Sequence, residues 1–359
     1  MLLQIFTSGD YWDPASRIRG YYVGRALSRH KFTVYIYPYN PIHGTLLKRS
    51  IHVFKDFLLK ILAIMSFRRT KPVIYIQRGI NSVPLVSLFF VIICKYIFRR
   101  KVIYDIDDGL FLTHPFEINS ILKLSDIVIA GGHELFRYCR NINSRVLLIP
   151  TSVDLSLYHK HEDKKTNENV TLGFVGSPAT IRYLTLLLNP LRKLSKYYDY
   201  TLRIVAARTK EDYEKYRSLL KKLKTCAKKV ETVPYSVEKE PEILRELDIG
   251  LAPLYEGAWK GDDWEKYKCG FKVINYMAAG IPPVASDYGE QGRIITDGYD
   301  GFLCRDEEDW FLKLSILLQD PERRRIMGEN ARKTAEAKYS LEKNIEKLEK
   351  IIMELLTEG

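Results

Sequence analysis

Several groups of residues have the types and spacing needed for chemistry on an anionic substrate. The first follows an apolar run that ends at Val175, where Gly176, Ser177 and Thr180 open a helical pattern with Arg182 in its first turn. Backbone N–H groups at a helix start, together with the helix dipole, bind phosphates. The pattern therefore predicts a diphosphate site, and the alternative is an ordinary strand-to-helix turn capped by Ser177 or Thr180.

A second group surrounds a basic loop that leads into a short helix. Lys268, Gly270, Phe271, Lys272 and Asn275 lie in this stretch. Lys272 and Asn275 are three residues apart, so they share one helix face. Lysines near a helix start favour an anion, and the alternative is a solvated basic loop.

Three carboxylates form a third group, at the end of a predicted strand over residues 102–106. They are Asp105, Asp107 and Asp108. Adjacent carboxylates can contact a sugar or bind Mg²⁺, and Asp108 can instead cap the helix that follows. The residues alone leave these three interpretations open.

A fourth group lies after the first predicted strand. Gly9 is the single glycine there, and Arg17 and Arg19 follow at the start of the first long helix. Residues two apart do not share a helix face. A helix that begins at Arg17 would allow one of the two to reach a phosphate, and the alternative is a solvated basic helix start.

Several well-known motifs are missing from the sequence. There is no G-x-G-x-x-G after the first strand, no P-loop, no H-E-x-x-H and no G-x-S-x-G. These absences argue against a dinucleotide oxidoreductase, a P-loop nucleotidase, a zinc protease and an α/β hydrolase. The five cysteines include no C-x-x-C pair, so we expect neither a zinc site nor disulfides, but a reduced, cytoplasmic protein.

The elements that must position these residues alternate between apolar strands and helical patterns. Such alternation predicts the α/β class: two Rossmann-like, doubly wound parallel-sheet domains with a central cleft at the carboxyl ends of their strands. We interpret the polar stretch over residues 156–169 as the linker between the two domains. We expect an N-terminal domain over 1–157 and a C-terminal domain over 168–339, with a last helix at about 340–359 that packs back onto the first domain.

The charge is distributed unevenly over the 359 residues. The net charge is +12, and residues 1–150 hold 21 Lys and Arg against 9 Asp and Glu, whereas the remaining residues hold 35 against 35. A uniformly basic nucleic-acid coat is therefore excluded, and an anionic surface facing the first half is favoured.

A basic and apolar region over residues 46–71 is the expected location of that surface. It carries Lys48, Lys55 and Arg68 among apolar neighbours, and Arg99-Arg100-Lys101 adds a second basic cluster. An amphipathic basic helix suits an anionic membrane, and the alternative is a core helix with a solvated face. The uncharged run 80–94 is too short to span a bilayer. It is either a buried helix or one that dips into a membrane surface.

The segment 264–286 also carries a family resemblance. Its core, Lys268-Cys-Gly-Phe-Lys-Val-Ile-Asn-Tyr-Met-Ala-Ala-Gly280-Ile-Pro-Pro-Val284, resembles the K-C-G-F-K-x-x-Q-Y-M-A-A-G-x-P-V branch of glycosyltransferase family 4. Other landmarks agree in order: Tyr104-Asp-Ile-Asp-Asp-Gly-Leu-Phe111, Phe174-Val-Gly-Ser-Pro-Ala-Thr180, Asp248-Ile-Gly-Leu-Ala-Pro253 and Asp297-Gly298 with Gly301-Phe-Leu303.

The resemblance implies a GT-B fold and retaining transfer of a sugar from a nucleotide-diphosphate sugar, without a metal or other cofactor at the reaction centre. The second domain would bind the donor, the first the acceptor, and the departing diphosphate would take the acceptor proton. The roles implied are catalytic for Asp107, Arg182 and Lys272. Donor binding falls to Gly176, Ser177, Thr180, Lys268, Gly270, Phe271 and Asn275, and acceptor binding to Gly9, Arg17, Arg19 and Asp108.

The chain departs from the family pattern at several of these positions. Tyr267 and Asn275 stand where the family has glutamates, Ser177 stands at the place of a phosphate-binding arginine, and Asp107 takes the place of a histidine. Two other functions therefore stay open: an inactive GT-B scaffold that binds a nucleotide sugar or a partner, and a nucleotide-sugar epimerase. The expected partners are a nucleotide-diphosphate sugar, a glycan or lipid-linked acceptor and an anionic membrane at the inner face of the cell, with no nucleic acid.

Overall fold

The computed structural model describes residues 1–359 except 43, 68, 82, 159–168, 258–262 and 358–359. The chain divides into two compact units, and each combines segments that are far apart in the sequence. The expected linker lies mostly outside the described residues. Unit 1 comprises Met1–Ser152, Tyr267–Cys269 and Leu341–Gly359, and unit 2 comprises Val153–Lys266 and Gly270–Ser340.

Unit 1 is built on a parallel sheet, as the apolar runs of its sequence predict. Its described part has six strands in the order β2-β1-β3-β4-β5-β6. The central strands are buried on both faces, which explains their continuous apolar runs. The strands are β1 (Leu2–Thr7), β2 (Thr33–Tyr37), β3 (Val73–Gln77), β4 (Val102–Ile106), β5 (Ile127–Ala130) and β6 (Val146–Leu148).

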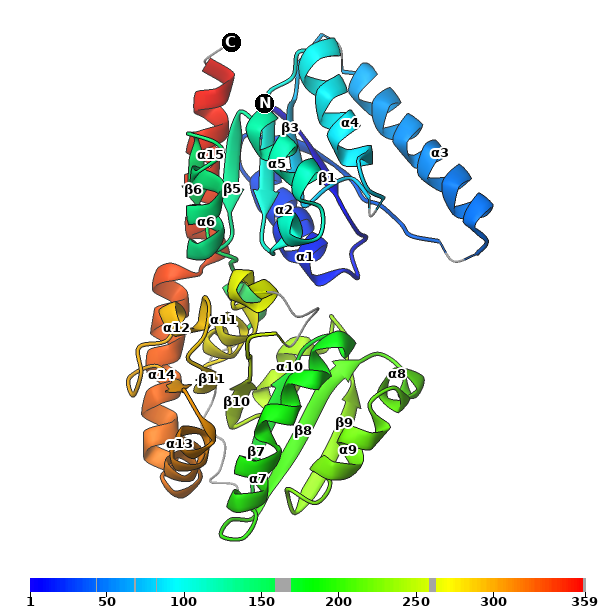
Figure 1. Cartoon of the computed structure of the whole chain (residues 1–359). Coiled ribbons are helices and arrows are strands. Elements are labelled where there is room, and N and C mark those ends of the chain that lie inside the picture. Colours follow the sequence, from blue (N-terminus) through cyan, green and yellow to red (C-terminus); the bar gives the residue numbers. More distant parts are fainter. Residues whose placement is uncertain (43, 68, 82, 159–168, 258–262, 358–359) are drawn as a thin grey trace. The chain divides into compact units, whose positions relative to one another are not determined.

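Helices cover both faces of this sheet (Figure 1). Residues of α3, α4, α5 and α6 share one apolar cluster with the sheet, and residues of α2 and α15 share the other. The helical segments are α1 (Pro14–Ser16), the π-helical η1 (Arg17–Tyr22), α2 (Val23–Ser28), α3 (Leu46–Met65), α4 (Val86–Ile92), the π-helical η2 (Ile93–Ile97), the 3₁₀ turn η3 (Leu110–Leu112), α5 (Pro115–Leu124), α6 (His133–Arg140) and α15 (Leu341–Thr357).

Unit 2 repeats the architecture with a different strand order. Its described part has a parallel sheet of six strands in the order β12-β11-β10-β7-β8-β9. The strand β7 therefore has β8 on one side and β10 on the other. The strands are β7 (Val170–Val175), β8 (Tyr200–Ala207), β9 (Lys229–Pro234), β10 (Ile249–Ala252), β11 (Pro283–Ser286) and β12 (Phe302–Cys304).

The first helical region of unit 2 differs from expectation. The sequence predicts a single helix over 180–197, but a 3₁₀ segment occupies Pro178–Leu187 and the α-helix begins only at Leu188. Pro190 explains the α-helical start, because proline has no N–H and fits only the first turn of an α-helix. The helical segments are η4 (Leu155–Leu157), η5 (Pro178–Leu187), α7 (Leu188–Leu194), α8 (Lys210–Glu214), α9 (Arg217–Leu223), α10 (Glu240–Arg245), η6 (Asp263–Tyr267), α11 (Phe271–Ala278), α12 (Gln291–Ile294), α13 (Glu307–Gln319) and α14 (Pro321–Lys338).

A tyrosine fixes α11 beneath the central strands of unit 2. The Tyr276 hydroxyl accepts from the N–H of Val175 at 2.8 Å and donates to the carbonyl oxygens of Gly173 and Leu251. The ring fits because Gly250 has no side chain: a Cβ there would lie 2.3 Å from Tyr276 Cγ. These contacts hold the start of α11, and thus Lys272, close to the end of β7.

Among the described residues, no helix is long and apolar enough to cross a membrane. All five cysteines are free thiols, and four of them are buried.

The helix α15 completes the apolar layer of unit 1. Ile352 is fully buried in a cluster that also contains Leu3, Ile5 and Leu27. We predict that Ile352→Ala lowers the free energy of unfolding of unit 1 by about 2–5 kcal/mol, because it removes apolar contacts and leaves a cavity. Urea unfolding followed by circular dichroism measures this change. The exposed Glu354 on the same helix provides the control, since Glu354→Ala should change the stability by less than about 0.5 kcal/mol.

Candidate functional site

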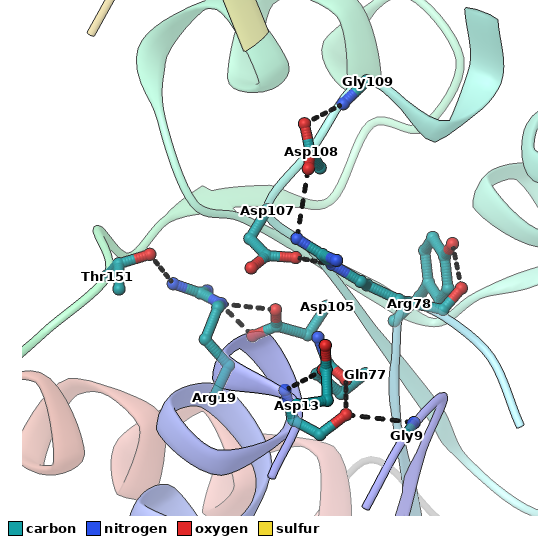
Figure 2. Close-up of polar contacts among 12 residues, drawn as sticks. Gly9, Asp13, Arg19, Gln77, Arg78, Asp105, Asp107, Asp108, Gly109 and Thr151 are labelled. Carbon is teal, nitrogen blue, oxygen red and sulfur yellow. Dashed lines mark hydrogen bonds and ion pairs between the residues drawn. The ribbon is translucent and has the colours of Figure 1, made fainter. Parts of the chain in front are cut away.

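The strand order of unit 1 creates a crevice at one end of its sheet. The chain runs from β1 to β2 on one side of β1 and then crosses to β3 on the other side. Ligands of open α/β sheets bind at such a reversal, outside the carboxyl ends of the strands. Gly9 follows β1, Arg78 follows β3 and Asp105 lies in β4, and Figure 2 shows these residues together.

Asp105 forms a buried ion pair with Arg19 at this end of the sheet. Arg19 donates from Nε to Oδ1 at 2.6 Å and from Nη2 to Oδ2 at 2.8 Å, and the hydroxyl of Tyr75 also donates to Oδ2. Burial raises the pKa of Asp105 above its ordinary value, although Arg19 opposes this rise. Burial alone would lower the pKa of Arg19, but the carboxylate holds it above its ordinary value.

Arg78 pairs with the two carboxylates that follow. Its Nε donates to Asp107 and its Nη2 donates to Asp108 at 3.3 Å. The Asp107 side chain is 4% exposed, whereas the Arg78 side chain is 23% exposed. One edge of the guanidinium is therefore bound to the acidic pair while part of the group stays accessible. No pattern in the sequence pointed to Arg78.

The backbone at Arg78 takes an uncommon conformation. Its φ angle is +60°, a left-handed value that a residue with a Cβ rarely adopts. The N–H of Arg78 donates to the carbonyl of Asp105 at 2.9 Å, and the hydroxyl of Tyr104 donates to the carbonyl of Arg78 at 2.8 Å. These two bonds hold the strained residue in place, a pattern that recurs at functional sites.

Asp108 does not cap a helix. The turn that follows it begins at Gly109 without a side-chain cap, so the capping interpretation is wrong. Burial raises the pKa of Asp108, and the nearby positive charges of Lys268 and Arg78 oppose this rise. Asp105, Asp107 and Asp108 all face arginines rather than one another, and the described residues contain no cluster of His, Cys, Asp or Glu arranged to hold a metal ion.

The first helix starts before Arg17, so neither Arg17 nor Arg19 stands at its first residue. It begins at Pro14, capped by Asp13, and continues through a π-helical turn at Arg17–Tyr22. Arg17 and Arg19 are buried rather than solvated, and Arg17 donates to the carbonyl of Tyr11 at 3.4 Å. Since Asp105 takes up the Arg19 guanidinium, the geometry favours a positioning role for Arg19 over direct contact with an acceptor.

Gly9 packs closely on the start of this helix. Its N–H donates to the Ser16 hydroxyl at 3.1 Å, and a Cβ at this position would lie 2.8 Å from Asp13 Cβ. The glycine therefore lets the loop after β1 approach the start of the helix that carries Arg19, the partner of Asp105.

Unit 2 has its own reversal of strand order, between β7 and β10. Gly176 lies at the carboxyl end of β7, and the side chain of Lys272 reaches this turn. A Cβ on Gly176 would lie 2.8 Å from Lys272 Nζ and 2.5 Å from Thr180 Oγ1. Lys272 Nζ also lies 5.5 Å from the centre of the Phe174 ring. A cation thus stands where this fold binds ligands.

Fewer amides than expected are available at the Gly176 turn. The N–H groups of Gly176, Ser177 and Thr180 donate to Val205 O, Thr180 Oγ1 and Ser177 O, and Pro178 has none. The expectation of free N–H groups is therefore wrong for these residues, because the neighbouring strand β8 accepts from Gly176 and the compact 3₁₀ turn satisfies Ser177 and Thr180 internally. Arg182 folds back on the same turn, where its Nε donates to Ala179 O at 2.8 Å.

Asn275 lies in a buried polar chain. Its Oδ1 accepts from the hydroxyl of Tyr158 at 2.6 Å, and its Nδ2 donates to Glu240 Oε1 at 2.8 Å. Glu240 Oε2 in turn accepts from the hydroxyl of Tyr235 at 3.1 Å. The structure thus places a carboxylate one hydrogen bond from Asn275, and the sequence analysis did not identify it.

The two lysines expected at the donor site, Lys268 and Lys272, belong to different units. Lys268 belongs to unit 1, with Asp108, whereas Lys272 belongs to unit 2. The expectation that both lie in the donor-binding domain is therefore wrong for Lys268.

Gly270 is the residue immediately before α11 and has a φ of +67°, and a Cβ there would lie 2.4 Å from Ile294 Cδ1. Phe271 is the first residue of α11. Gly270 therefore allows the sharp entry into the helix that carries Lys272.

Comparison with known proteins identifies the domain. Residues 169–320 match the family model described as "Glycosyl transferases group 1". This part of the chain is therefore similar to group 1 glycosyltransferase domains. A further match is the uncharacterized glycosyltransferase MJ1069 of Methanocaldococcus jannaschii, 26% identical over 121 residues, which are 33% of this chain and 29% of that protein. The match thus spans less than a third of that relative.

Solved structures are similar in fold to the chain over its whole length. Sucrose-phosphate synthase of Thermosynechococcus elongatus superposes with a TM-score of 0.78 at 15% identity, covering 100% of this chain and 99% of that one. Anabaena HepE, solved with UDP-glucose, gives 0.71 at 15% identity and covers 100% and 99%. WaaG, described as a glycosyltransferase involved in lipopolysaccharide biosynthesis, gives 0.65 at 14% identity and covers 98% and 99%. The GT-B fold predicted from the sequence is confirmed.

The pair of Arg78 and Asp107 can be tested by a double-mutant cycle. We predict that Arg78→Met and Asp107→Asn are coupled by about 1–3 kcal/mol in unfolding free energy, because Arg78→Met leaves the buried Asp107 carboxylate without its cation and Asp107→Asn removes the charge that Arg78 Nε binds. The control is the more exposed pair Arg137 and Glu134, for which the coupling should stay below about 1 kcal/mol. Equal coupling in both cycles would contradict the role given to Arg78.

Proposed function

We propose that this glycosyltransferase moves a sugar from a nucleotide-diphosphate sugar to an acceptor with retention of configuration, and that unit 2 binds the donor. The observation that carries this proposal is Lys272 beside Gly176, at the reversal of strand order in unit 2. The residues from 151 onward have no net charge. Donor binding must therefore depend on individually placed cations such as Lys272, and not on an overall field.

Lys272 would stabilise the negative charge that develops on the diphosphate as the glycosidic bond breaks. A preorganised positive charge lowers the barrier most where the transition state is more charged than the substrate. Arg182, which lies in the first turn after Ser177, is the second cation proposed for this role. Thr180 Oγ1 lines the same turn.

Asn275 and Glu240 are proposed as the contacts for the donor ribose. Both are on elements of unit 2, and Asn275 is three residues beyond Lys272 on α11, so it lies one turn further along the helix. A carboxylate accepts hydrogen bonds from two ribose hydroxyls more strongly than a carboxamide can. Glu240 would thus supply the charge that the family has at position 275.

Asp107 and Asp108 are proposed to contact the acceptor or the transferred sugar. Because Asp107 is paired with Arg78, it is better suited to hold a hydroxyl in position than to take up a proton. In the retaining mechanism proposed here, the departing diphosphate takes that proton. We propose a glycan or lipid-linked acceptor, used in the cytoplasm, and the five free thiols agree with a reduced compartment.

One observation favours the rival function of a scaffold without transfer. Tyr267 stands where the family has a glutamate, and its ring packs on Phe111 of unit 1 with 4.8 Å between ring centres. The Tyr267 ring therefore contributes to packing and supplies no carboxylate for a contact with the donor.

A turnover assay separates the proposed functions. The full chain is incubated with labelled nucleotide sugars, with and without a panel of glycan and lipid-linked acceptors. Acceptor-dependent release of the nucleoside diphosphate supports the transferase. A changed sugar with no nucleotide release supports an epimerase, and binding without either change supports the scaffold.

The role of Lys272 makes a specific prediction. Because HepE was solved with UDP-glucose, UDP is the first probe, and calorimetry measures its Kd. Lys272→Met should weaken binding about ten- to a hundredfold, since a charged hydrogen bond to phosphate is lost. Lys221 on α9 is exposed, and Lys221→Met should leave the Kd unchanged. An unchanged Kd for Lys272→Met would count against the proposed donor site.

A further inference from the structure

The helix α3 exposes an unusual number of apolar side chains. One face carries six of them at spacings of three or four residues, which places them in a single stripe. Leu47 is 70% exposed and Phe54 is 67% exposed. Soluble proteins rarely leave a contiguous apolar stripe of this length in water, and such stripes mark interaction surfaces. The stripe, called the α3 stripe below, consists of Leu47, Ile51, Phe54, Leu58, Leu62 and Met65.

The opposite side of α3 is fastened to unit 1, so the stripe cannot turn inward. Lys60 is 3% exposed and donates from Nζ to Asp56 at 2.8 Å and to the carbonyl of Ile80 at 2.7 Å. Ile64 is fully buried in the apolar cluster that lies on this face of the sheet. The Gln4 side chain also donates to the carbonyl of Ala63 at 2.9 Å. Figure 1 shows α3 at the outer edge of unit 1, beside α4.

Positive charges lie along one side of the stripe without acidic counterparts. Lys48 and Lys55 are exposed and lie seven residues apart, so they flank the stripe on one side, and Arg49 is exposed at its start. Between Asp13 and Asp105 the chain has a single acidic residue, Asp56. Asp56 is paired with Lys60 on the fastened side of the helix. Arg68, the third basic residue expected here, lies outside the described residues.

We propose that the α3 stripe docks on an anionic lipid surface. The apolar side chains would enter the boundary between headgroups and acyl chains, and Lys48 and Lys55 would contact lipid phosphates. This combination distinguishes a lipid surface from a second copy of the chain. Two copies joined through the stripe would bring the same lysines together, and like charges at an interface repel. The expectation of a core helix with a solvated basic face does not fit a helix whose outward face is mainly apolar.

Co-sedimentation with vesicles tests the proposal without donor or acceptor. The full chain is mixed with phosphatidylcholine vesicles and with vesicles of equal parts phosphatidylcholine and phosphatidylglycerol, at low and at high salt. We expect binding to the anionic vesicles that weakens at high salt. Ile51→Gln/Phe54→Gln/Leu58→Gln should reduce the partition constant by more than about tenfold, because apolar burial is lost. Lys48→Gln/Lys55→Gln should reduce it about thirtyfold, on anionic vesicles only.

Matched variants in unit 2 control for altered composition. Leu312→Gln/Ile316→Gln removes exposed apolar groups of α13, and Lys221→Gln/Lys222→Gln removes exposed charges of α9. Both should bind vesicles like the unaltered chain. The proposal is overturned if the unaltered chain ignores anionic vesicles, or if the stripe variant binds as well as the controls do. It is also overturned if light scattering shows a dimer that the stripe variant dissociates. Because the assay involves no sugar transfer, its failure would leave the donor site proposed for unit 2 untouched.

Discussion

The arrangement of the first helix, β3 and β4 in unit 1 depends on a carboxylate that is buried at the end of a central strand. Asp105 cannot remain charged inside the protein without compensation, and Arg19 and Tyr75 supply it from the first helix and from β3. This requirement holds the helix after β1 against the carboxyl ends of β3 and β4. Asp107 and Asp108 follow on the same strand end, so the buried pair also fixes where the more accessible carboxylates and Arg78 meet.

Most of the fold could be predicted from local patterns. Continuous apolar runs identified the strands because these strands are covered on both faces, and Pro321 and Asp320 mark the start of α14 with the residue types that such positions prefer. The turn at Gly176 and the helix of Lys272 were also predicted, because a glycine after a strand and a lysine in a helix start are local signals. The π-helical turn after Ser16 and the 3₁₀ segment after Ser177 carry no comparable signal.

The partners within the site could not be predicted. Arg78 meets Asp107 because the neighbouring strands β3 and β4 end side by side. Glu240 meets Asn275 because the fold brings α10 beside α11, two helices that are far apart in the sequence. Arg78 also follows its strand in a conformation that favours glycine, so its residue type gave no warning of the turn. Lys268 was assigned to the donor domain because it is close to Lys272 in sequence, yet the chain passes from one unit to the other between them.

The position of α15 has a consequence for how the protein is made. Unit 1 needs both the first 152 residues and the final helix, whereas all the strands of unit 2 lie between these two segments. On the ribosome, the chain emerges from its N-terminus onward, so the apolar surface that Ile352 and its neighbours cover stays open until α15 has been synthesised, after every strand of unit 2. During that interval the nascent chain exposes an apolar sheet face, and such faces favour aggregation.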